Sequence, residues 1–335
     1  MTIKLIALSD LHQGNPISPP RGTKVISQKK LIQSLINRTP KPDGILLAGD
    51  LQDYMWNDGT NPKSIDKIKK LLKKDQVFNV LNKTSIPVFF VWGNTDILDF
   101  EKENAHLGYN NTPQTDELRE WFCEEFPNLQ NCHIKTKYIE NLPIIGYDDA
   151  NKTIDPSGKS WEEPQILEEL QPLIRAFNIK KRKKTIIMTH TAPRGVLDFS
   201  SLGDKHIGSY YLRELIEDYQ PLLSIFGHIH YCGGYSEFIG RTLCVNISSF
   251  GLAVSHDILF GQSAFELGID EEKNEVISTK MIVSNYYHGN KQKFFVEYRR
   301  CQACGRHTPF ARKQFKICRV CLAARRIESK KNLSF

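Results

Sequence analysis

Five apolar segments of this 335-residue chain each lead into residues that can bind a metal ion. Apolar runs of this length that end in Gly or polar residues predict buried strands, here residues 3–8, 45–48, 88–91, 185–189 and 222–226. Segments of helical character separate them, for example residues 27–38, 62–81 and 210–219. Strands that alternate with helices predict an α/β fold, in which ligands bind beyond the carboxyl ends of the strands. Seven candidate ligands lie at those ends: Asp10, His12, Asp50, Asn94, His190, His228 and His230.

These seven residues combine carboxylate and amide oxygens with imidazole nitrogens. Such a mixture suits Mn²⁺, Fe²⁺, Ni²⁺ or Zn²⁺, and the lack of thiolates argues against a copper or iron–sulfur centre. Two ions roughly 3.5–4 Å apart can share one carboxylate and one hydroxide, and Asp50 is the best candidate for the shared carboxylate. A single Asp or His after a strand is more often a cap, but seven together predict a dinuclear site that hydrolyses a phosphate ester.

Five short motifs follow one another along the chain in a fixed order: Asp10-Leu11-His12, Gly49-Asp50, Gly93-Asn94-Thr95-Asp96, Thr189-His190 and Gly227-His228-Ile229-His230. Together they resemble the calcineurin-like metallophosphoesterase superfamily over residues 1–260. The resemblance implies a metallophosphoesterase-type β-sandwich flanked by helices. It also implies one metal bound by Asp10, His12 and His230, a second bound by Asn94, His190 and His228, and Asp50 between them. Residues 190–222, which include His206-Ile207-Gly208-Ser209, are similar to prokaryotic phosphoesterases of the Icc-like branch.

The third motif departs from the family's commonest form, in which Asn is followed by a His that is taken to protonate the leaving oxygen. Thr95 stands at that position, and a hydroxyl cannot act as a general acid near neutral pH. A contribution of roughly 10²–10⁴-fold would then need another source. His206 is the candidate because it lies on the loop after the fourth predicted strand; the alternative is a hydrogen-bonded loop histidine. The expected catalytic residues are Asp50, Asn94, His206 and Thr95.

Two cysteine pairs near the end of the chain have the spacing of a structural zinc site. Cys301 and Cys304 are separated by thirteen residues from Cys318 and Cys321, which suits tetrahedral Cys₄ zinc. Gly305 permits the turn of a zinc knuckle, so the pattern is similar to a treble-clef or zinc-ribbon module. Disulfides or a redox dithiol are the less favoured alternatives, because the other four cysteines are scattered and the chain opens with a strand rather than a signal peptide.

Charge divides the chain into two parts. Residues 291–335 hold 13 Lys and Arg against two Glu, a net +11, so the preceding 290 residues carry about −4 of the total +7. We expect a catalytic domain over residues 1–290, with a lid insertion within residues 97–140, and a basic Cys₄ zinc module over residues 291–335. The aromatic residues of the basic module could stack on bases while its cations bind phosphates, which predicts contact with RNA or DNA. The alternatives are that the aromatics form the module's core, or that the module binds a protein partner.

Other basic stretches predict solvated surfaces. In residues 62–81 the apolar side chains of Ile65, Ile68, Leu71 and Leu72 are expected to face inward and the lysines outward. Residues 180–184 predict a solvated loop. No apolar run approaches the roughly 20 residues of a membrane helix, so a cytoplasmic protein without membrane contact is expected.

The sequence therefore predicts a phosphodiesterase that acts on nucleic acid or nucleotides. Its expected nucleophile is a hydroxide that bridges two divalent metals, and the zinc tail is expected to recruit the substrate. One alternative is a weakly active scaffold that docks a protein complex through its zinc module. A phosphoprotein phosphatase is another alternative.

Overall fold

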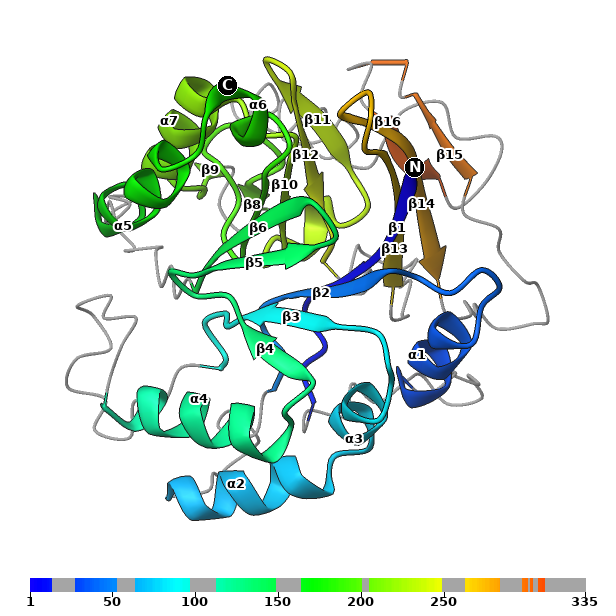
Figure 1. Ribbon diagram of the computed structural model, residues 1–335, viewed down its shortest axis with the longest axis vertical. Helices are drawn as coiled ribbons and strands as arrows, with labels where there is room; N and C mark the ends of the chain where they lie inside the picture. Colours follow the sequence, from blue (N-terminus) through cyan, green and yellow to red (C-terminus); the bar gives the residue numbers. More distant parts are fainter. Residues whose placement is uncertain are drawn as a thin grey trace, which may run out of the picture.

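Two β-sheets packed face to face form the centre of the molecule, with helices on both outer sides (Figure 1). This computed structural model describes residues 1–13, 28–52, 64–96, 113–148, 164–200, 205–248, 263–283, 297–300, 302–303 and 307–310. The layered arrangement confirms the predicted α/β sandwich.

The first sheet has six strands in the order β14-β13-β1-β2-β3-β4. They are β1 (Thr2–Leu8), β2 (Gly44–Ala48), β3 (Val88–Val91), β4 (Leu129–Asn131), β13 (Ser263–Asp270) and β14 (Glu275–Val283). The second sheet has eight strands in the order β15-β16-β11-β12-β10-β7-β6-β5. They are β5 (Thr136–Ile139), β6 (Leu142–Tyr147), β7 (Ile186–Thr189), β10 (Leu223–Phe226), β11 (Ser236–Ile239), β12 (Thr242–Asn246), β15 (Glu297–Arg300) and β16 (His307–Phe310). A separate hairpin contains β8 (Phe199–Ser200) and β9 (Lys205–His206).

Side chains of the central strands alternate between two apolar layers. In β1, Ile3, Leu5 and Ala7 lie in the cluster between the two sheets, whereas Ile6 and Leu8 lie in the cluster beneath the helices. β2 and β3 alternate in the same way. Successive side chains of a strand point to opposite faces, so a strand buried on both faces reads as a continuous apolar run. This is why β1, β2, β3, β7 and β10 could be predicted from the sequence.

Helices cover the outer face of each sheet (Figure 1). The first sheet is covered by α1 (Gln28–Ile36), α2 (Ile65–Lys74), α3 (Gln76–Asn82) and α4 (Pro113–Glu125). The second is covered by α5 (Pro164–Arg175) and α7 (Tyr210–Tyr219), with the short α6 (Ile179–Arg182) and the 3₁₀ turn η1 (His230–Cys232) in its connections.

The predicted helix over residues 62–81 is two helices in the structure. Asp75 separates α2 from α3 with an extended ψ of 127°. Its Oδ1 atom accepts hydrogen bonds from the backbone N–H groups of Val77 and Phe78 at 2.7 and 3.1 Å. A carboxylate that caps the N-terminus of a new helix satisfies donors left unpaired there, which explains the break.

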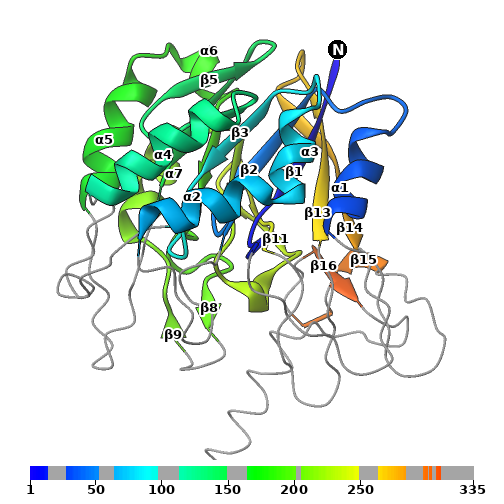
Figure 2. The same ribbon diagram turned by 90° about the horizontal axis from the view of Figure 1, so that it is seen from below.

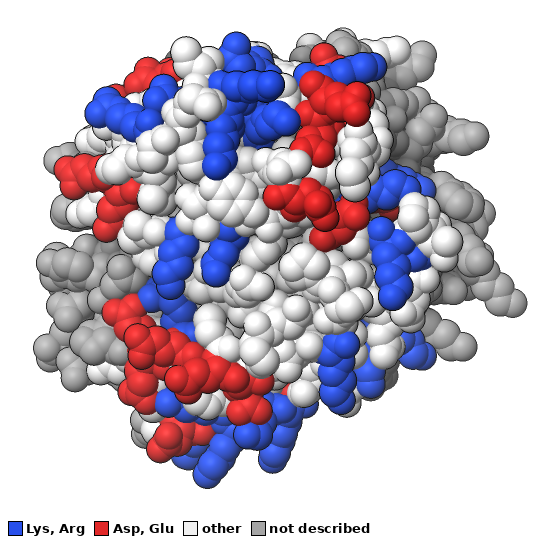
Figure 3. Space-filling view, viewed as in Figure 1, with Lys and Arg blue, Asp and Glu red and all other residues white. Residues whose placement is uncertain are grey.

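The strands that precede the candidate ligands are parallel within each sheet: β1, β2 and β3 in the first sheet, β7 and β10 in the second. Their carboxyl ends lie on one side of the molecule, which we call the ligand edge. Figure 2 shows the β8–β9 hairpin projecting from this edge, opposite to the N-terminus and α6. Figure 3 shows the side where the parallel strands begin, where basic side chains gather around α6. The basic stretch of residues 180–184 therefore lies away from the candidate ligands.

Much of the segment expected to hold an insertion belongs to the sandwich itself. Residues 113–140 form α4, which packs over the first sheet, then β4 beside β3 and β5 beside β6. Residues 97–112 lie outside the described residues. Among the helices that the structure describes, none is long and apolar enough to cross a membrane.

Candidate metal centre

The loops after the five ligand-bearing strands are hydrogen-bonded to one another at the ligand edge. The backbone N–H of Asp10 donates to Gly49 O, and that of His12 donates to Asp50 O, both at 3.0 Å. In the second sheet the N–H of Gly227 donates to His190 O at 3.0 Å. Each sheet thereby extends its strand pairing for a few residues, so the first ligands on each loop are held at fixed spacing.

Four of the seven candidate ligands have left-handed backbone conformations. The φ angles are 57° for Asp10, 43° for His12, 49° for Asp50 and 62° for His228. Residues other than glycine rarely adopt this region, and such strain persists only where the surrounding structure compensates for it. The backbone therefore turns sharply after β1, β2 and β10, and these turns direct the ligand side chains toward one another.

Two groups of donor atoms lie at the ligand edge, and each group combines residues from both sheets. One contains Asp10, His12 and His230, the other Asp50, His190 and His228, and the donor atoms of each group lie within 4.8 Å of one another. His230 Nε2 lies 2.8 Å from Asp10 Oδ1 and 3.4 Å from His12 Nε2. The predicted grouping of Asp10, His12 and His230 is thus brought together in space.

Asn94 lies beside the second group, and Asp50 connects the two groups. His190 Nε2 lies 3.3 Å from Asp50 Oδ1 and 3.2 Å from Asn94 Oδ1. The other Asp50 oxygen, Oδ2, lies 3.8 Å from His12 Nε2 of the first group. Asp50 therefore faces both groups, as expected for a carboxylate shared by two ions.

Two glycines allow this close approach. A Cβ atom on Gly227 would lie 1.9 Å from Ser9 Oγ and 2.6 Å from Asp10 Oδ2. Gly49 has a φ of +84°, and a Cβ atom there would lie 2.5 Å from His190 Nδ1. That nitrogen contacts Ala48 O at 2.8 Å, which sets the orientation of the imidazole. The glycines of the motifs are thus required by the packing of the ligands.

The electrostatics of the site call for positive charge. Burial favours the neutral form of Asp10, but the adjacent His230 and His190 outweigh it and lower the pKa of Asp10 to about 2. The pKa of Asp50 is lowered too, because His190 and His12 outweigh its burial. Asp50 in turn raises the pKa of His190 to about 10, although the burial of His190 by itself would lower it. Both carboxylates are therefore ionised, and a proton on His190 holds the place of positive charge that a cation would supply.

The donor set fits two divalent cations. Asp10 Oδ2 is buried, and the described residues give it no hydrogen-bond partner, which is expensive unless a cation or water satisfies it. Asp10 and His190 are fully buried, whereas the side chains of His12 and His230 are 16% and 21% exposed. Solvent, and hence a substrate, would reach the site from the His12 and His230 side.

Thr95 uses its polar groups to bind the neighbouring loop that carries Asp50 and Gln52. Its hydroxyl donates to Gln52 O at 2.7 Å, and its backbone N–H donates to Asp50 Oδ1 at 2.9 Å. Its side chain is engaged in fixing the Asp50 loop, and its N–H orients the carboxylate of Asp50. A hydroxyl committed to a backbone carbonyl does not protonate a leaving group.

Asp96 belongs to the third motif, but no role was predicted for it. Its fully buried carboxylate accepts three backbone N–H groups, from Leu51 at 3.0 Å, Gln52 at 2.8 Å and Gly93 at 2.9 Å. Burial and the nearby Asp50 charge raise the pKa of Asp96 to about 8, and cations bound beside Asp50 would offset the second of these effects. Asp96 joins the loops that hold Asp50 and Asn94. An acidic residue two positions after a ligand is the sequence signal for it.

His206 forms a dyad with Asp198, a residue that was not predicted from the sequence. His206 Nδ1 lies 2.6 Å from Asp198 Oδ1. The other carboxylate oxygen accepts the N–H groups of Gly195 and Gly208, both at 2.9 Å, and Asp198 is fully buried. A carboxylate oxygen accepts hydrogen bonds, so Nδ1 donates this one and Nε2 takes no part in it. The His206 side chain is 54% exposed.

The loop that carries this dyad is fastened to the metal-site loops. Ser209 N–H donates to Ala192 O at 2.9 Å, close behind His190. On the other side, Asn246 Nδ2 donates to Leu197 O, beside Asp198, at 3.5 Å and to Ile229 O, beside His230, at 3.2 Å. β8 also contacts η1, which begins at His230. The dyad therefore stands at the ligand edge, held between the loops of His190 and His230.

The four cysteines predicted to bind zinc lie outside the described residues, but the strands around the first pair are described. β15 and β16 form an antiparallel hairpin in which Arg300 pairs with His307, with a turn at Gln302 and Ala303. His307 also pairs with Ser236 at the start of β11. Ser236 in turn pairs with Val245 near the carboxyl end of β12, which runs parallel to β10. The β15–β16 hairpin thus joins the second sheet at the ligand edge (Figure 2).

A family profile and one solved structure with a TM-score above 0.5 match this chain. Residues 3–232 match the sequence profile of the calcineurin-like phosphoesterase family. One solved structure is 16% identical with a TM-score of 0.53, and the match covers 85% of this chain and 100% of that one. The protein TT1561 of Thermus thermophilus is 14% identical with a TM-score of 0.46, over 84% of this chain and 99% of its own. No curated protein is a significant match.

Proposed function

The chain belongs to the calcineurin-like phosphoesterase family, and on that premise we propose that it is a phosphodiesterase acting on nucleic acid or nucleotides. The observation that carries the proposal is the pair of donor groups at one edge, with Asp50 facing both. When bound, two divalent ions would supply a water-derived nucleophile and neutralise charge on the phosphoryl group. Mn, Fe, Ni and Zn all suit the donors.

The residues of the chain divide the remaining work. Asp10, His12 and His230 would hold one ion, Asn94, His190 and His228 the other, and Asp50 would lie between them. Thr95 N–H and Asp96 keep the Asp50 carboxylate and its loop in position. The exposed side at His12 and His230 admits the substrate.

His206 is the proposed proton donor to the leaving oxygen, oriented by Asp198. The distance of 2.6 Å between Nδ1 and Oδ1 fixes the imidazole, and its exposed position leaves Nε2 open to a substrate. This assignment gives the reaction the acid that Thr95 cannot supply.

Leaving-group dependence tests this role. His206→Ala should lower turnover of a dinucleotide by roughly 10²-fold or more, because a ribose oxygen needs a proton to leave. Turnover of bis-p-nitrophenyl phosphate, whose leaving group needs none, should change little, and metal content should stay the same. Asp198→Asn should show the same selectivity with a smaller loss. Equal losses on both esters would rule out a proton-donating role.

The basic tail is proposed to bind one structural zinc through Cys301, Cys304, Cys318 and Cys321 and to recruit a polymeric substrate. Attachment of the β15–β16 hairpin at the ligand edge supports recruitment. Purified protein should retain about one zinc under mild chelation, and Cys318→Ser should release it.

Affinity for RNA or DNA should fall steeply as salt rises; a flat response would favour a protein partner instead. A cytoplasmic location stays a prediction.

The activity itself is tested with bis-p-nitrophenyl phosphate and added Mn²⁺. Wild-type protein should hydrolyse it and Asp50→Asn should not, although Asn keeps the size of the side chain. A screen of single-stranded and double-stranded nucleic acids, cyclic nucleotides and phosphopeptides then identifies the substrate. Turnover confined to phosphopeptides would replace the proposal with a phosphoprotein phosphatase.

A further inference from the structure

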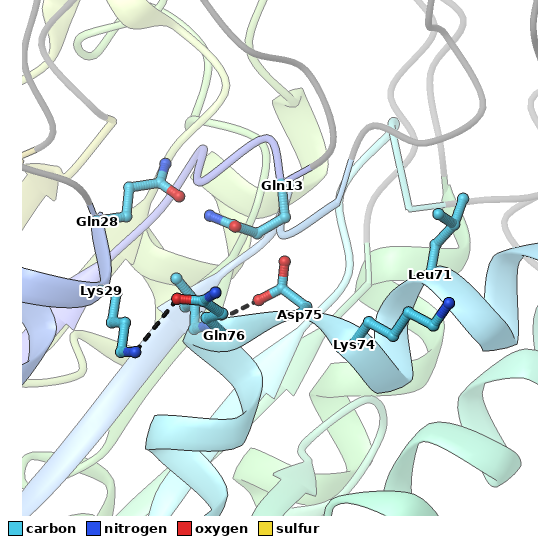
Figure 4. A pocket seen from close by; sticks show the side chains of 8 residues that line it. Gln13, Gln28, Lys29, Leu71, Lys74, Asp75 and Gln76 are labelled. Carbon is cyan, nitrogen blue, oxygen red and sulfur yellow. Dashed lines mark hydrogen bonds between the residues drawn. The ribbon is translucent and has the colours of Figure 1, made fainter.

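A pocket lies between the loop that follows β1 and the helices α1, α2 and α3 (Figure 4). Its volume is about 460 Å³, within the roughly 300–1,000 Å³ of pockets that bind small molecules. The pocket is therefore large enough for one nucleotide, and the reaction proposed above makes no use of it.

The pocket wall is hydrogen-bonded to the loops that carry the ligands. Gln13 lines the pocket and directly follows His12, and its backbone N–H donates to Leu51 O, next to Asp50, at 3.1 Å. Gln28, on the opposite wall, donates its side-chain amide to Leu11 O between Asp10 and His12. The pocket wall is therefore continuous with the loops that carry His12 and Asp50.

Positive charge dominates the lining. Lys29 and Lys74 are its cations, and Asp75 is its acid. Asp75 is only 8% exposed and accepts two backbone N–H groups of α3, so its charge is already compensated. The Nε2 atom of Gln13 is buried, and the described residues give it no acceptor; Figure 4 shows its amide between Gln28 and Asp75. Ammonium groups and an available amide N–H are donors for phosphate oxygens.

An apolar surface lies next to these donors. Leu71 was expected to face inward on α2, but it is 39% exposed and lines the pocket. Ile68 and Leu72, which belong to the same predicted stripe, are buried in the core. Exposed apolar surface beside phosphate donors suits the base or sugar of a nucleotide, whereas a simple anion would not use it.

We propose that this pocket binds the nucleotide next to the scissile phosphodiester, with Lys29 and Lys74 at its phosphate, Gln13 donating an amide N–H and Leu71 against its base or sugar. This inference rests on the proposed function and adds a substrate-positioning site to it. A site of this kind would make the enzyme favour a nucleotide chain over a small ester.

The test compares Lys29→Ala/Lys74→Ala with a matched control, Lys67→Ala/Lys70→Ala. The control removes two exposed lysines of α2 that do not line the pocket. For a single-stranded oligonucleotide the pocket variant should raise KM about tenfold and lower the salt slope of binding by roughly 2, one for each phosphate contact. Its kcat/KM for bis-p-nitrophenyl phosphate should match wild type. Equal oligonucleotide KM and salt slope in both double variants would overturn the inference.

Binding measured without turnover separates this inference from the proposed function. Fluorescence anisotropy of a labelled oligonucleotide on the Asp50→Asn protein should show weaker binding when Lys29 and Lys74 are replaced. Unchanged affinity overturns the pocket, whereas wild-type protein that fails to hydrolyse any ester overturns the proposed function. A nucleoside monophosphate should compete with the oligonucleotide more strongly than inorganic phosphate. Equal competition by the two would overturn the assignment to a nucleotide.

Discussion

Replacing Asp96 should show how much of the metal centre depends on a residue that binds no metal. Its buried carboxylate accepts the N–H groups of Leu51, Gln52 and Gly93 at 2.8–3.0 Å. Asp96→Ala leaves all three N–H donors without their acceptor at once. Each buried N–H left unpaired costs about 1–3 kcal/mol, and water entering the vacated space recovers part of that. We expect Asp96→Ala to lower the free energy of unfolding by about 3–5 kcal/mol.

Asp96→Asn sharpens the test because it preserves size. Its oxygen can still accept from Leu51 and Gln52, but its amide group then meets the N–H of Gly93, so only one donor loses its acceptor. The expected loss is about 1–2 kcal/mol. Urea unfolding at about pH 9, where Asp96 with its pKa of about 8 is ionised, measures both values. The affinity for Mn²⁺ should decrease from wild type to Asp96→Asn and further to Asp96→Ala, because the Asp50 loop loosens.

Asp218→Ala serves as the control, since that exposed carboxylate lies on α7 away from the ligand edge. It should change the free energy of unfolding by less than about 0.5 kcal/mol. A loss below about 1 kcal/mol for Asp96→Ala, or equal losses for the Asn and Ala variants, would refute the counting of backbone donors.

Three further outcomes are expected. Gly227→Ala should reduce bound metal, measured by elemental analysis, because its Cβ would lie 1.9 Å from Ser9 Oγ and push against Asp10; full metal occupancy would contradict the packing argument. Burial lowers the pKa of His133. As the pH falls through about 6.5, His133 therefore binds a proton in the unfolded chain while it stays neutral in the native protein. Stability should therefore fall as the pH drops below about 6.5, and His133→Gln, followed by denaturation across pH, should have a shallower slope. Removing metal with a chelator should lower the free energy of unfolding by about 2.7 kcal/mol relative to protein with free metal at 100 times its Kd. Chelation should change the free energy of unfolding of Asp50→Asn far less.

The sequence was most informative where burial is uniform. β1, β2, β3, β7 and β10 are buried on both faces, so their apolar runs are visible without knowledge of their neighbours. The residues that follow them could then be grouped as ligands by their chemistry. Where burial is partial the local pattern failed. Residues 62–81 read as one helix although Asp75 divides them, and Leu71 fits the inward stripe although it faces a pocket.

Taken by itself, the sequence determined the five doubly buried strands that lead into the site and the ligand types that follow them, because strand burial and residue chemistry are local properties. Only the tertiary structure decided which loops meet. Asp96 binds the Asp50 loop across more than 40 residues, and Asp198 orients His206 through a fold of the loop that no periodicity reveals. The same is true of the pocket, whose wall combines Gln13 with Lys74. Contacts between distant segments depend on strand order and loop path, which are set by the packing of the whole sandwich rather than by the residues at either end.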